Sequence, residues 1–410
     1  MYIINIKRLH MVADSSVGHL AGAQMDNVPA AENAWLRIRD GKIKAYGDMK
    51  EFGAENASEE IYDAGGGDVM PTFCDSHTHI IYAGSRDGEF LDKIRGLSYE
   101  EIAARGGGIL NSADRLHDTS EDELYRQSLE RAREMMSKGT GAFEVKSGYG
   151  LTVADELKML RVAARIRESV PARVKITFLG AHAVGRAYQG RQGEYVDMLI
   201  REMLPAVAAE GLADYVDVFC DRGFFTVEET DRILSAAAHF GLRPKIHANE
   251  LDNSGGVQIG VKHKAISVDH LERMGADEIE VLRNSDTVAT MLPGASFFLG
   301  MPYAPARQAV DAGLTVALAS DYNPGSSPSG DMRMVWALGC IKMRLTPTEA
   351  LAACTLNGAA AMELGTELGT LAPGRTASFI VTKPVPSLAF IPYAYTTPWL
   401  RDVFIAGKKI

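Results

Sequence analysis

The stretch VMPTFCDSHTH, residues 69–79, joins a short apolar run to two histidines that are one residue apart. Side chains alternate along an extended strand, so His77 and His79 point the same way and can share one metal ion. A β-rich apolar run that ends in polar residues returns repeatedly along the chain. The eight runs are VMPTFCD (69–75), GAFEVK (141–146), RVKITFLG (173–180), YVDVFC (215–220), RPKIH (243–247), AISVDH (265–270), TVATML (287–292) and LTVALAS (314–320).

Longer stretches with helical periodicity separate these runs, for example ADELKMLRVAARIRES and TVEETDRILSAAAHFG. Alternating strands and helices form parallel sheets, and eight such units predict a (β/α)8 barrel of the TIM type. The two ends of the chain instead show short strands and turns. We therefore expect a barrel at residues 68–365 and a small β-sandwich domain built from both termini, residues 1–67 plus 366–410.

The composition limits the possible partners. The formal net charge is -10 and no Lys/Arg-rich run occurs, which argues against nucleic acid or an anionic membrane as a partner. No apolar stretch approaches ~18 residues and no signal peptide is evident, so we expect a cytoplasmic protein. The four cysteines are widely scattered and predict buried thiols rather than disulfides. An anionic substrate would need a local cation, and Arg86 is a candidate.

Polar residues gather where the predicted strands end, which is the reactive end of such a barrel. A lone histidine at a strand end is more often an ordinary hydrogen-bonded residue than a ligand, and Asp321 lies in a segment rich in turn formers. Several ligand-type residues at matching strand ends nevertheless favour a functional site. They are His77, His79, His182, His247, Glu250, His270 and Asp321.

This pattern resembles the amidohydrolase superfamily, which has H-x-H after the first barrel strand, histidines after the fifth and sixth strands and an aspartate after the eighth. Within that superfamily the chain is similar to the imidazolonepropionase family, through motifs such as HTHIIYAGSRDGEF, FEVKSGYGL, TFLGAHAV, KIHANELDNSGG and DYNPGSSP. The resemblance covers nearly the whole chain. It implies metal-dependent hydrolysis of the cyclic amide bond of 4-imidazolone-5-propanoate to N-formimino-L-glutamate in histidine degradation, by a homodimer.

The expected metal ligands are His77, His79, His247 and Asp321. Imidazoles with a carboxylate suit zinc or iron and leave a position for water, but the residues do not decide between the two metals. Relatives with two metals carry a carboxylated lysine at the end of the fourth strand, which here reads DVFCDRG without lysine. We therefore expect one divalent or trivalent metal ion per chain.

The remaining candidates are expected to act on water and substrate. His270 and Glu250 are predicted to activate and orient the water, and Asp321 to transfer the proton. His182 is placed to hydrogen-bond and polarise the ring carbonyl. The residues predicted to bind a small anionic heterocycle are Arg86, Tyr99, Tyr149, His182 and Glu250, and the resemblance adds Asn323, Gly325 and Ser326.

Two alternatives stay open. Another mononuclear amidohydrolase or a deaminase acting on a related small heterocycle would share the metal residues, although a neutral ring would not require Arg86. A binding or scaffold protein that kept the barrel without catalysis would be expected to have lost Asp321, His270 or Glu250. Because these residues are present, the hydrolase is the favoured interpretation.

Overall fold

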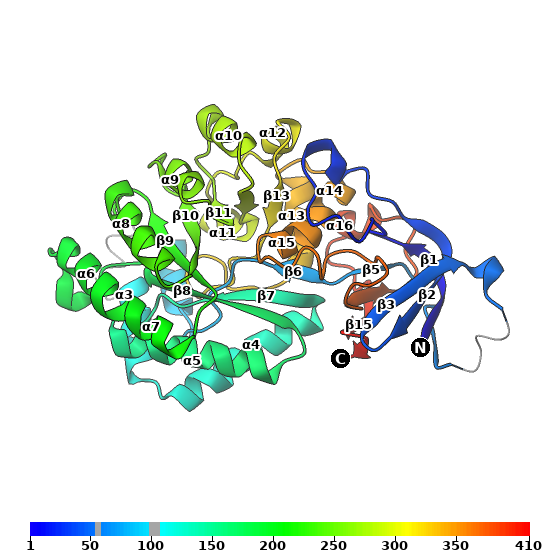
Figure 1. Cartoon of the computed structure of the whole chain (residues 1–410), viewed down its shortest axis with the longest axis horizontal. Coiled ribbons are helices and arrows are strands. Elements are labelled where there is room, and N and C mark those ends of the chain that lie inside the picture. Colours follow the sequence, from blue (N-terminus) through cyan, green and yellow to red (C-terminus); the bar gives the residue numbers. More distant parts are fainter. Residues whose placement is uncertain (54–58, 98–106) are drawn as a thin grey trace.

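A computed structural model describes residues 1–53, 59–97 and 107–410, which contain two sheets (Figure 1). One sheet has eight parallel strands in chain order and forms the barrel, so the predicted fold class is confirmed. Its strands are β6 (Phe73–Asp75), β7 (Thr140–Lys146), β8 (Arg173–Ala181), β9 (Tyr215–Cys220), β10 (Arg243–Ala248), β11 (Ser267–His270), β12 (Val288–Met291) and β13 (Val316–Leu318). They are buried over most of their length, which explains why the sequence shows them as near-continuous apolar runs.

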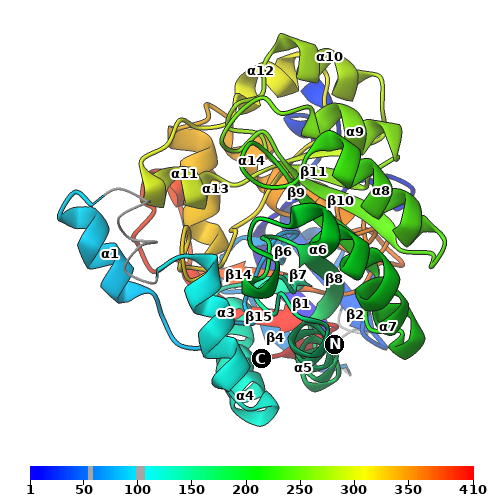
Figure 2. The same ribbon diagram turned by 90° about the vertical axis from the view of Figure 1, so that its left-hand side faces the viewer.

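Helices surround this barrel (Figure 2). In the order of the chain they are α1 (Asp87–Ile94), α3 (Ile109–Asp118), α4 (Glu121–Ser137), α5 (Val153–Ser169), α6 (Gln192–Met198), α7 (Leu204–Glu210), α8 (Val227–Ala238), α9 (Gly256–Lys262), α10 (Ala276–Arg283), α11 (Pro293–Leu299), α12 (Ala306–Asp311), α13 (Met332–Ile341), α14 (Pro347–Cys354), α15 (Leu356–Ala360) and α16 (Phe390–Tyr393). Local sequence explains their starts. In α8, Thr226 accepts the N–H of Glu229 and the Glu229 side chain accepts the N–H of Thr226.

The first and last barrel strands are joined just beyond their ends. The N–H of His79 donates to the carbonyl of Tyr322 at 2.9 Å, and the N–H of Asp321 donates to the carbonyl of His77 at 3.0 Å. Thr78 and Tyr322 form a parallel bridge between these two segments. The barrel therefore closes at the residues predicted to bind the metal.

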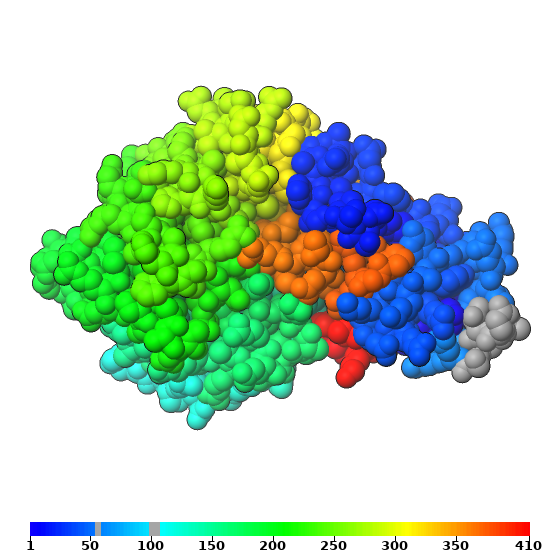
Figure 3. Space-filling view, in the orientation of Figure 1, coloured from blue at the N-terminus to red at the C-terminus, as the bar shows by residue number. Residues whose placement is uncertain are grey.

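The termini form a separate mixed sheet beside the barrel. Its strands are β1 (Tyr2–Leu9), β2 (Ala31–Arg39), β3 (Lys42–Asp48), β4 (Ile61–Asp63), β5 (Val69–Pro71), β14 (Phe379–Thr382), β15 (Leu400–Ile405) and β16 (Lys408–Lys409). The N-terminal segment also packs against the barrel side of the molecule (Figure 3). There, the side chain of Asn357 in α15 accepts the N–H of Leu20 and donates to its carbonyl, both at 2.9 Å. The limits at 67/68 and 365/366 stay a prediction.

The run at residues 69–75, expected to be one strand, is divided between the two sheets. Residues Val69–Pro71 pair with β14, whereas Phe73–Asp75 pair with β7. The change occurs at Thr72, whose N–H donates to Ser378, while the next N–H, of Phe73, donates to Gly139. An apolar run shows burial but not the sheet to which it belongs, so the sequence could not reveal this division.

Two further expectations concern the whole chain. Cys74, Cys220 and Cys354 are buried free thiols, and Cys340 is partly exposed. Among the described residues, no helix combines the length and the apolar character needed to cross a membrane.

Candidate metal centre and active site

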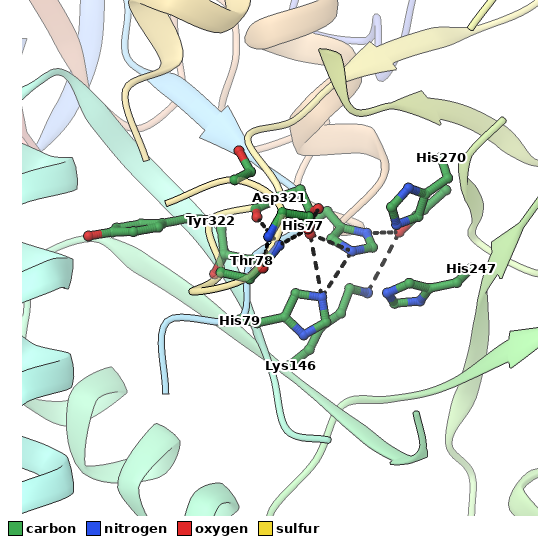
Figure 4. A network of polar contacts seen from close by, with 12 residues as sticks. His77, Thr78, His79, Lys146, His247, His270, Asp321 and Tyr322 are labelled. Carbon is green, nitrogen blue, oxygen red and sulfur yellow. Dashed lines mark hydrogen bonds and ion pairs between the residues drawn. The ribbon is translucent and has the colours of Figure 1, made fainter. Parts of the chain in front are cut away.

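Side chains from the ends of β6, β10, β11 and β13 meet at one end of the barrel (Figure 4). The Nε2 atoms of His77 and His79 are 3.2 Å apart, and each lies 3.6 Å from Oδ1 of Asp321. The ligand atoms of His77, His79 and His247 all lie within 4.8 Å of one another, and those of His77, His270 and Asp321 form a second such group. The structure thus brings the four predicted ligands together and adds His270 beside them.

The geometry and the chemistry of these histidines fit a metal ion. Two nitrogens bound to a tetrahedral ion at ~2.0–2.1 Å lie about 3.3 Å apart, close to the observed separation of His77 and His79. Burial lowers the pKa of both imidazoles well below the usual value, and the cation Lys146 lowers it further. Both side chains are therefore neutral, which is the form that binds metals. The cluster of His77, His79 and His247 could hold a metal ion.

Two buried carboxylates orient these histidines. Nδ1 of His77 lies 2.7 Å from Oδ2 of Asp269, and Nδ1 of His247 lies 2.9 Å from Oδ2 of Asp217. A carboxylate in this position holds a proton on Nδ1 and leaves the lone pair on Nε2. The hydrogen bond to Asp269 thus prepares His77 to bind an ion through Nε2, and His247 lies at ion-pair distance from Asp217.

The same carboxylates belong to a network of buried charges inside the barrel. Lys146 donates to Oε1 of Glu144 at 2.6 Å and to Oδ2 of Asp217 at 2.8 Å. Lys245 donates to Glu144 and to the carbonyl of Ser76. Burial alone would lower the pKa of Lys146, but Asp217 and Glu144 outweigh it and raise the pKa above the usual value. Lys146 therefore stays a cation that is bound to carboxylates.

His270 and Glu250 form a second polar group at the rim of the cluster. Nε2 of His270 lies 3.6 Å from Oε2 of Glu250, and its Nδ1 lies 3.6 Å from Oε2 of Glu272. Burial would lower the pKa of His270, but the two carboxylates raise it to about 10. Burial raises the pKa of Glu250 to about 7, against the opposing charge of His270. His270 is therefore an imidazolium at neutral pH, and Glu250 titrates near neutrality.

Several residues at the strand ends and loops around the site have left-handed backbone conformations. The φ angles are 56° at Leu151, 56° at Asn249, 85° at His270 and 54° at Asp321. Such conformations cost of order 1–3 kcal/mol each in a residue other than glycine and persist only where the surroundings hold them. The loops that carry the candidate residues are thus held in defined shapes by the rest of the fold.

A cavity of about 340 Å³ adjoins the histidine cluster. This volume suits a small molecule. Its lining combines candidate ligands, catalytic residues and substrate-binding residues, so the structure brings these predicted residues into one site. They are His79, Arg86, Tyr149, His182, His247, Glu250, His270, Asp321, Asn323, Gly325 and Ser326. Tyr99, which was predicted to bind the substrate, lies outside the described residues.

Arg86 enters this cavity from the start of α1 and is paired with an acidic neighbour. Its Nε and Nη2 atoms donate to Oε2 of Glu89 at 3.0 and 2.7 Å, and the Arg86 side chain is 10% exposed. A Cβ atom on Gly325 would lie 2.3 Å from Nη1 of Arg86. Glycine at this position therefore lets the guanidinium lie against the loop that follows β13.

Lys93 is a second cation in the cavity, which the sequence reasoning missed. Its Nζ donates to the carbonyl of Gly325 at 3.1 Å. Burial and the charge of Arg86 lower the pKa of Lys93. The sequence could have indicated this position, because Lys93 follows Arg86 by seven residues and residues seven apart on a helix share one face.

His182 and Tyr149 also line the pocket, with their rings 5.3 Å apart. Nδ1 of His182 lies 3.0 Å from the carbonyl of Gly148, and burial lowers the pKa of His182 to about 3. A neutral imidazole that donates from Nδ1 to a carbonyl keeps a lone pair on Nε2. Burial raises the pKa of Tyr149, so its phenol remains protonated and can donate a hydrogen bond.

The loop after β13 is built around Asn323. Its Oδ1 accepts the N–H groups of Gly325 and Ser326 at 2.8 Å, and its Nδ2 donates to the carbonyl of Asp321 at 2.7 Å. The hydroxyl of Ser326 donates to Oδ2 of Asp321 at 3.1 Å. These bonds give the segment NPGSS one shape, with Gly325 and Ser326 on the cavity wall.

The sequence reasoning also missed the buried charges beneath the cluster. Glu144, Lys146, Asp217, Lys245 and Asp269 are all 0% exposed. Each stands inside a β-rich apolar run, where a charged residue is unusual. That contrast was a signal in the sequence, because buried charges in such runs require partners of the opposite sign.

Comparisons with known proteins agree with this class of site. The amidohydrolase family matches residues 69–410. The chain therefore belongs to the amidohydrolase family. It is 52% identical to a protein of Christiangramia forsetii named imidazolonepropionase, with 100% of both chains covered. It is 39% identical to an imidazolonepropionase of Thermoanaerobacter pseudethanolicus, with 96% of this chain and 94% of the relative covered. The resemblance predicted from the sequence is confirmed.

Solved structures show the same fold at low sequence identity. Atrazine chlorohydrolase from Arthrobacter aurescens TC1, complexed with zinc, has a TM-score of 0.73 and 15% identity, covering 100% of this chain and 94% of that one. The 5-methylcytosine deaminase of Klebsiella pneumoniae has a TM-score of 0.74 and 17% identity, covering 100% and 98%. These similarities support the barrel and the separate sheet.

Proposed function

We propose that this chain hydrolyses the cyclic amide bond of 4-imidazolone-5-propanoate to N-formimino-L-glutamate, a reaction of histidine degradation. One observation carries the proposal. A single cavity joins the histidine cluster to two cations, Arg86 and Lys93, so a small ring and its carboxylate tail fit together. The full-length similarity to proteins named imidazolonepropionase supports the same substrate.

The metal is expected to bind to His77, His79, His247 and Asp321. When bound, zinc or iron would lower the pKa of a water molecule toward neutrality. His270 lies 3.6 Å from both Glu250 and Glu272, and we assign it to the acid–base group rather than to the ligands. We favour one ion per chain, because Lys146 is a cation that donates to Glu144 and Asp217 rather than a free amine available for carboxylation.

The cations would bind the substrate by its propanoate. Arg86 and Lys93 compensate its negative charge within a protein of net charge -10, and charge-assisted hydrogen bonds from Arg86 fix its direction. Tyr149 can add a hydroxyl donor, and Tyr99 remains a candidate for the same contact. Asn323, Gly325 and Ser326 are proposed to line the ring from the loop after β13.

The acid and base groups would then carry the protons. The oxygen of water adds to the ring carbonyl carbon, the C–N bond breaks and the ring nitrogen receives a proton. Glu250, whose pKa lies near 7, suits the base that takes the proton of the water. His270, as an imidazolium, would stabilise the developing negative charge and orient Glu250. Asp321 is proposed to receive this proton from Glu250 and to pass it to the leaving nitrogen, so the proton lost by the water is the one that the nitrogen gains.

His182 has a proposed contact that differs from the one expected from the sequence. Because Nδ1 donates to Gly148, the lone pair on Nε2 would accept an N–H of the substrate ring. Polarising the ring carbonyl would instead require a second proton on this imidazole, which burial opposes. A homodimer and a cytoplasmic location stay predictions from the sequence.

Metal analysis of the purified protein, combined with a spectroscopic assay for loss of imidazolone propanoate, tests the proposal. We expect zinc or iron in the protein and hydrolysis that stops when a chelator removes the metal and returns when it is restored. A metal-loaded protein that leaves imidazolone propanoate unchanged would refute the proposed activity.

A further inference from the structure

Two buried carboxylates lie behind the cavity and outside its lining. Asp221 follows β9 directly and is 3% exposed, and Glu156 lies in the first turn of α5 and is 0% exposed. Within the described part of the chain, neither carboxylate forms an ion pair with a lysine or arginine. A buried carboxylate without a cation requires other hydrogen-bond donors. Backbone N–H groups of two active-site loops supply them.

Asp221 binds the loop that follows β10. Its Oδ2 accepts the N–H groups of Glu250 and Leu251, both at 2.9 Å. Its Oδ1 accepts the N–H of Asp252 at 3.1 Å and the hydroxyl of Ser254. One carboxylate thus fixes the turn from which the Glu250 side chain enters the cavity.

Glu156 binds the loop that follows β7 in the same way. Its Oε1 accepts the N–H of Gly150 at 2.7 Å and that of Leu151 at 3.0 Å. Its Oε2 accepts the N–H of Gly148 at 3.2 Å. These three residues flank Tyr149, so the carboxylate holds the backbone on both sides of the tyrosine.

We propose that Asp221 and Glu156 are positioning residues that set where Glu250 and Tyr149 stand in the active site. Neither side chain lines the cavity, so each acts through its hydrogen bonds to a loop, which are mostly to backbone N–H groups. The two residues should therefore affect different properties. Asp221 should act on the chemical step through Glu250, and Glu156 should act on substrate binding through Tyr149.

Backbone strain gives an independent reason for these contacts. Asn249, next to the N–H groups bound by Asp221, has a φ of 56°, and Leu151, bound by Glu156, also has a φ of 56°. Left-handed conformations at residues other than glycine relax when nothing holds them. Loss of either carboxylate would thus move the loop rather than only weaken it.

Steady-state kinetics of isosteric amide variants separate the two roles. An amide keeps the shape but replaces one acceptor oxygen by a donor, which cannot accept a backbone N–H. We expect Asp221→Asn to lower kcat about ten- to a hundredfold with less than about a threefold change in KM, because a small misplacement of a catalytic group has effects of this size. Glu156→Gln should raise KM about tenfold with a smaller fall in kcat.

Amide hydrogen exchange tests the contacts without substrate, since only the roles of Glu250 and Tyr149 rest on the proposed function. In Asp221→Asn we expect faster exchange at residues 250–252 and unchanged exchange in β10. Asp214→Asn is a matched control, because Asp214 accepts the N–H of Ile176 at 2.9 Å at the opposite end of the strands. It should leave exchange at 250–252 and both kinetic constants unchanged.

The outcomes distinguish the possible failures. Unchanged exchange at residues 250–252 in Asp221→Asn would overturn the anchoring role, and equal changes of kcat and KM in the two amide variants would overturn the separate roles. A wild-type protein without imidazolone hydrolysis would refute the proposed function, and exchange would still decide the anchoring. If Asp221→Asn does not fold, Ser254→Ala should raise exchange at 250–252 and lower kcat about threefold, and no change in either would overturn the proposal.

Discussion

Replacing Arg86 by methionine tests how the site holds an anion. The guanidinium is 10% exposed and lines the cavity, and a charged hydrogen bond in such a place is worth roughly 1.5–3 kcal/mol. At ~1.4 kcal/mol per tenfold, its loss should raise KM about ten- to a hundredfold. Glu89 would lose its cationic partner at 2.7 Å, keep the hydrogen bonds from Gly108 and Asn111, and remain as a negative charge near the substrate carboxylate. Lys93 stays in the cavity and keeps the effect within this range.

Steady-state kinetics on the acid and on its propanamide analogue measure this effect. The fall in kcat should be smaller than the rise in KM, and metal content should be unchanged, because arginine is not a ligand. Arg95→Met is a matched control, since Arg95 lies at the end of the same helix with its side chain 70% exposed. If Arg86→Met raises KM as much for the neutral amide as for the acid, Arg86 does not bind the carboxylate and instead stabilises the loop.

Further predictions concern the metal, the base and the loop after β13. Alanine at His79 or His247 removes a ligand, so metal content and turnover should fall together, and a fully loaded, fully active variant would refute the assignment. Elemental analysis should find one tightly bound ion per chain. Two ions would contradict the proposal that Lys146 is a cation and not available for carboxylation. The Glu250 carboxyl has a pKa raised to about 7 and is protonated below that pH, so kcat/KM should fall about tenfold per pH unit on the acid side. Glu250→Gln should abolish this fall of kcat/KM at acid pH. If the fall persists in the variant, a group other than Glu250 causes it. In Gly325→Ala the new Cβ would meet Arg86 at 2.3 Å, so KM should rise about tenfold with metal content unchanged. An unchanged KM would show that the guanidinium can move aside at no cost.

The barrel could be predicted because its strands are buried on both faces. The run YVDVFC at residues 215–220 coincides with β9, and the segment predicted as a helix at 154–169 lies within α5. The division of residues 69–75 could not be predicted, because it depends on which neighbour each backbone N–H meets. Hydrophobic pattern shows that a segment is buried, not what lies beside it.

The strand-end residues were predictable because parallel strands place their carboxyl ends together. Asp321 and His270 were found in this way. The role proposed for Asp221 could not be predicted, because Asp221 accepts N–H groups of a loop that is nearly thirty residues further along the chain. The pairing of Arg86 with Glu89, three residues away, lay within reach of sequence reasoning, but its contact with Gly325 did not.

The closure of the barrel has a consequence for how the protein matures. The bonds from His79 to Tyr322 and from Asp321 to His77 seal the first strand against the last. An ion bound by these same segments would stabilise the contact between the first and last strands, since a ligand that binds only the native state stabilises that state. A nascent chain could not form this metal site until Asp321 had been synthesised and the barrel had closed. Metal binding would then be the last step of folding. In a protein without metal, we expect proteases to cleave first near the contact between residues 77–79 and residues 321–322.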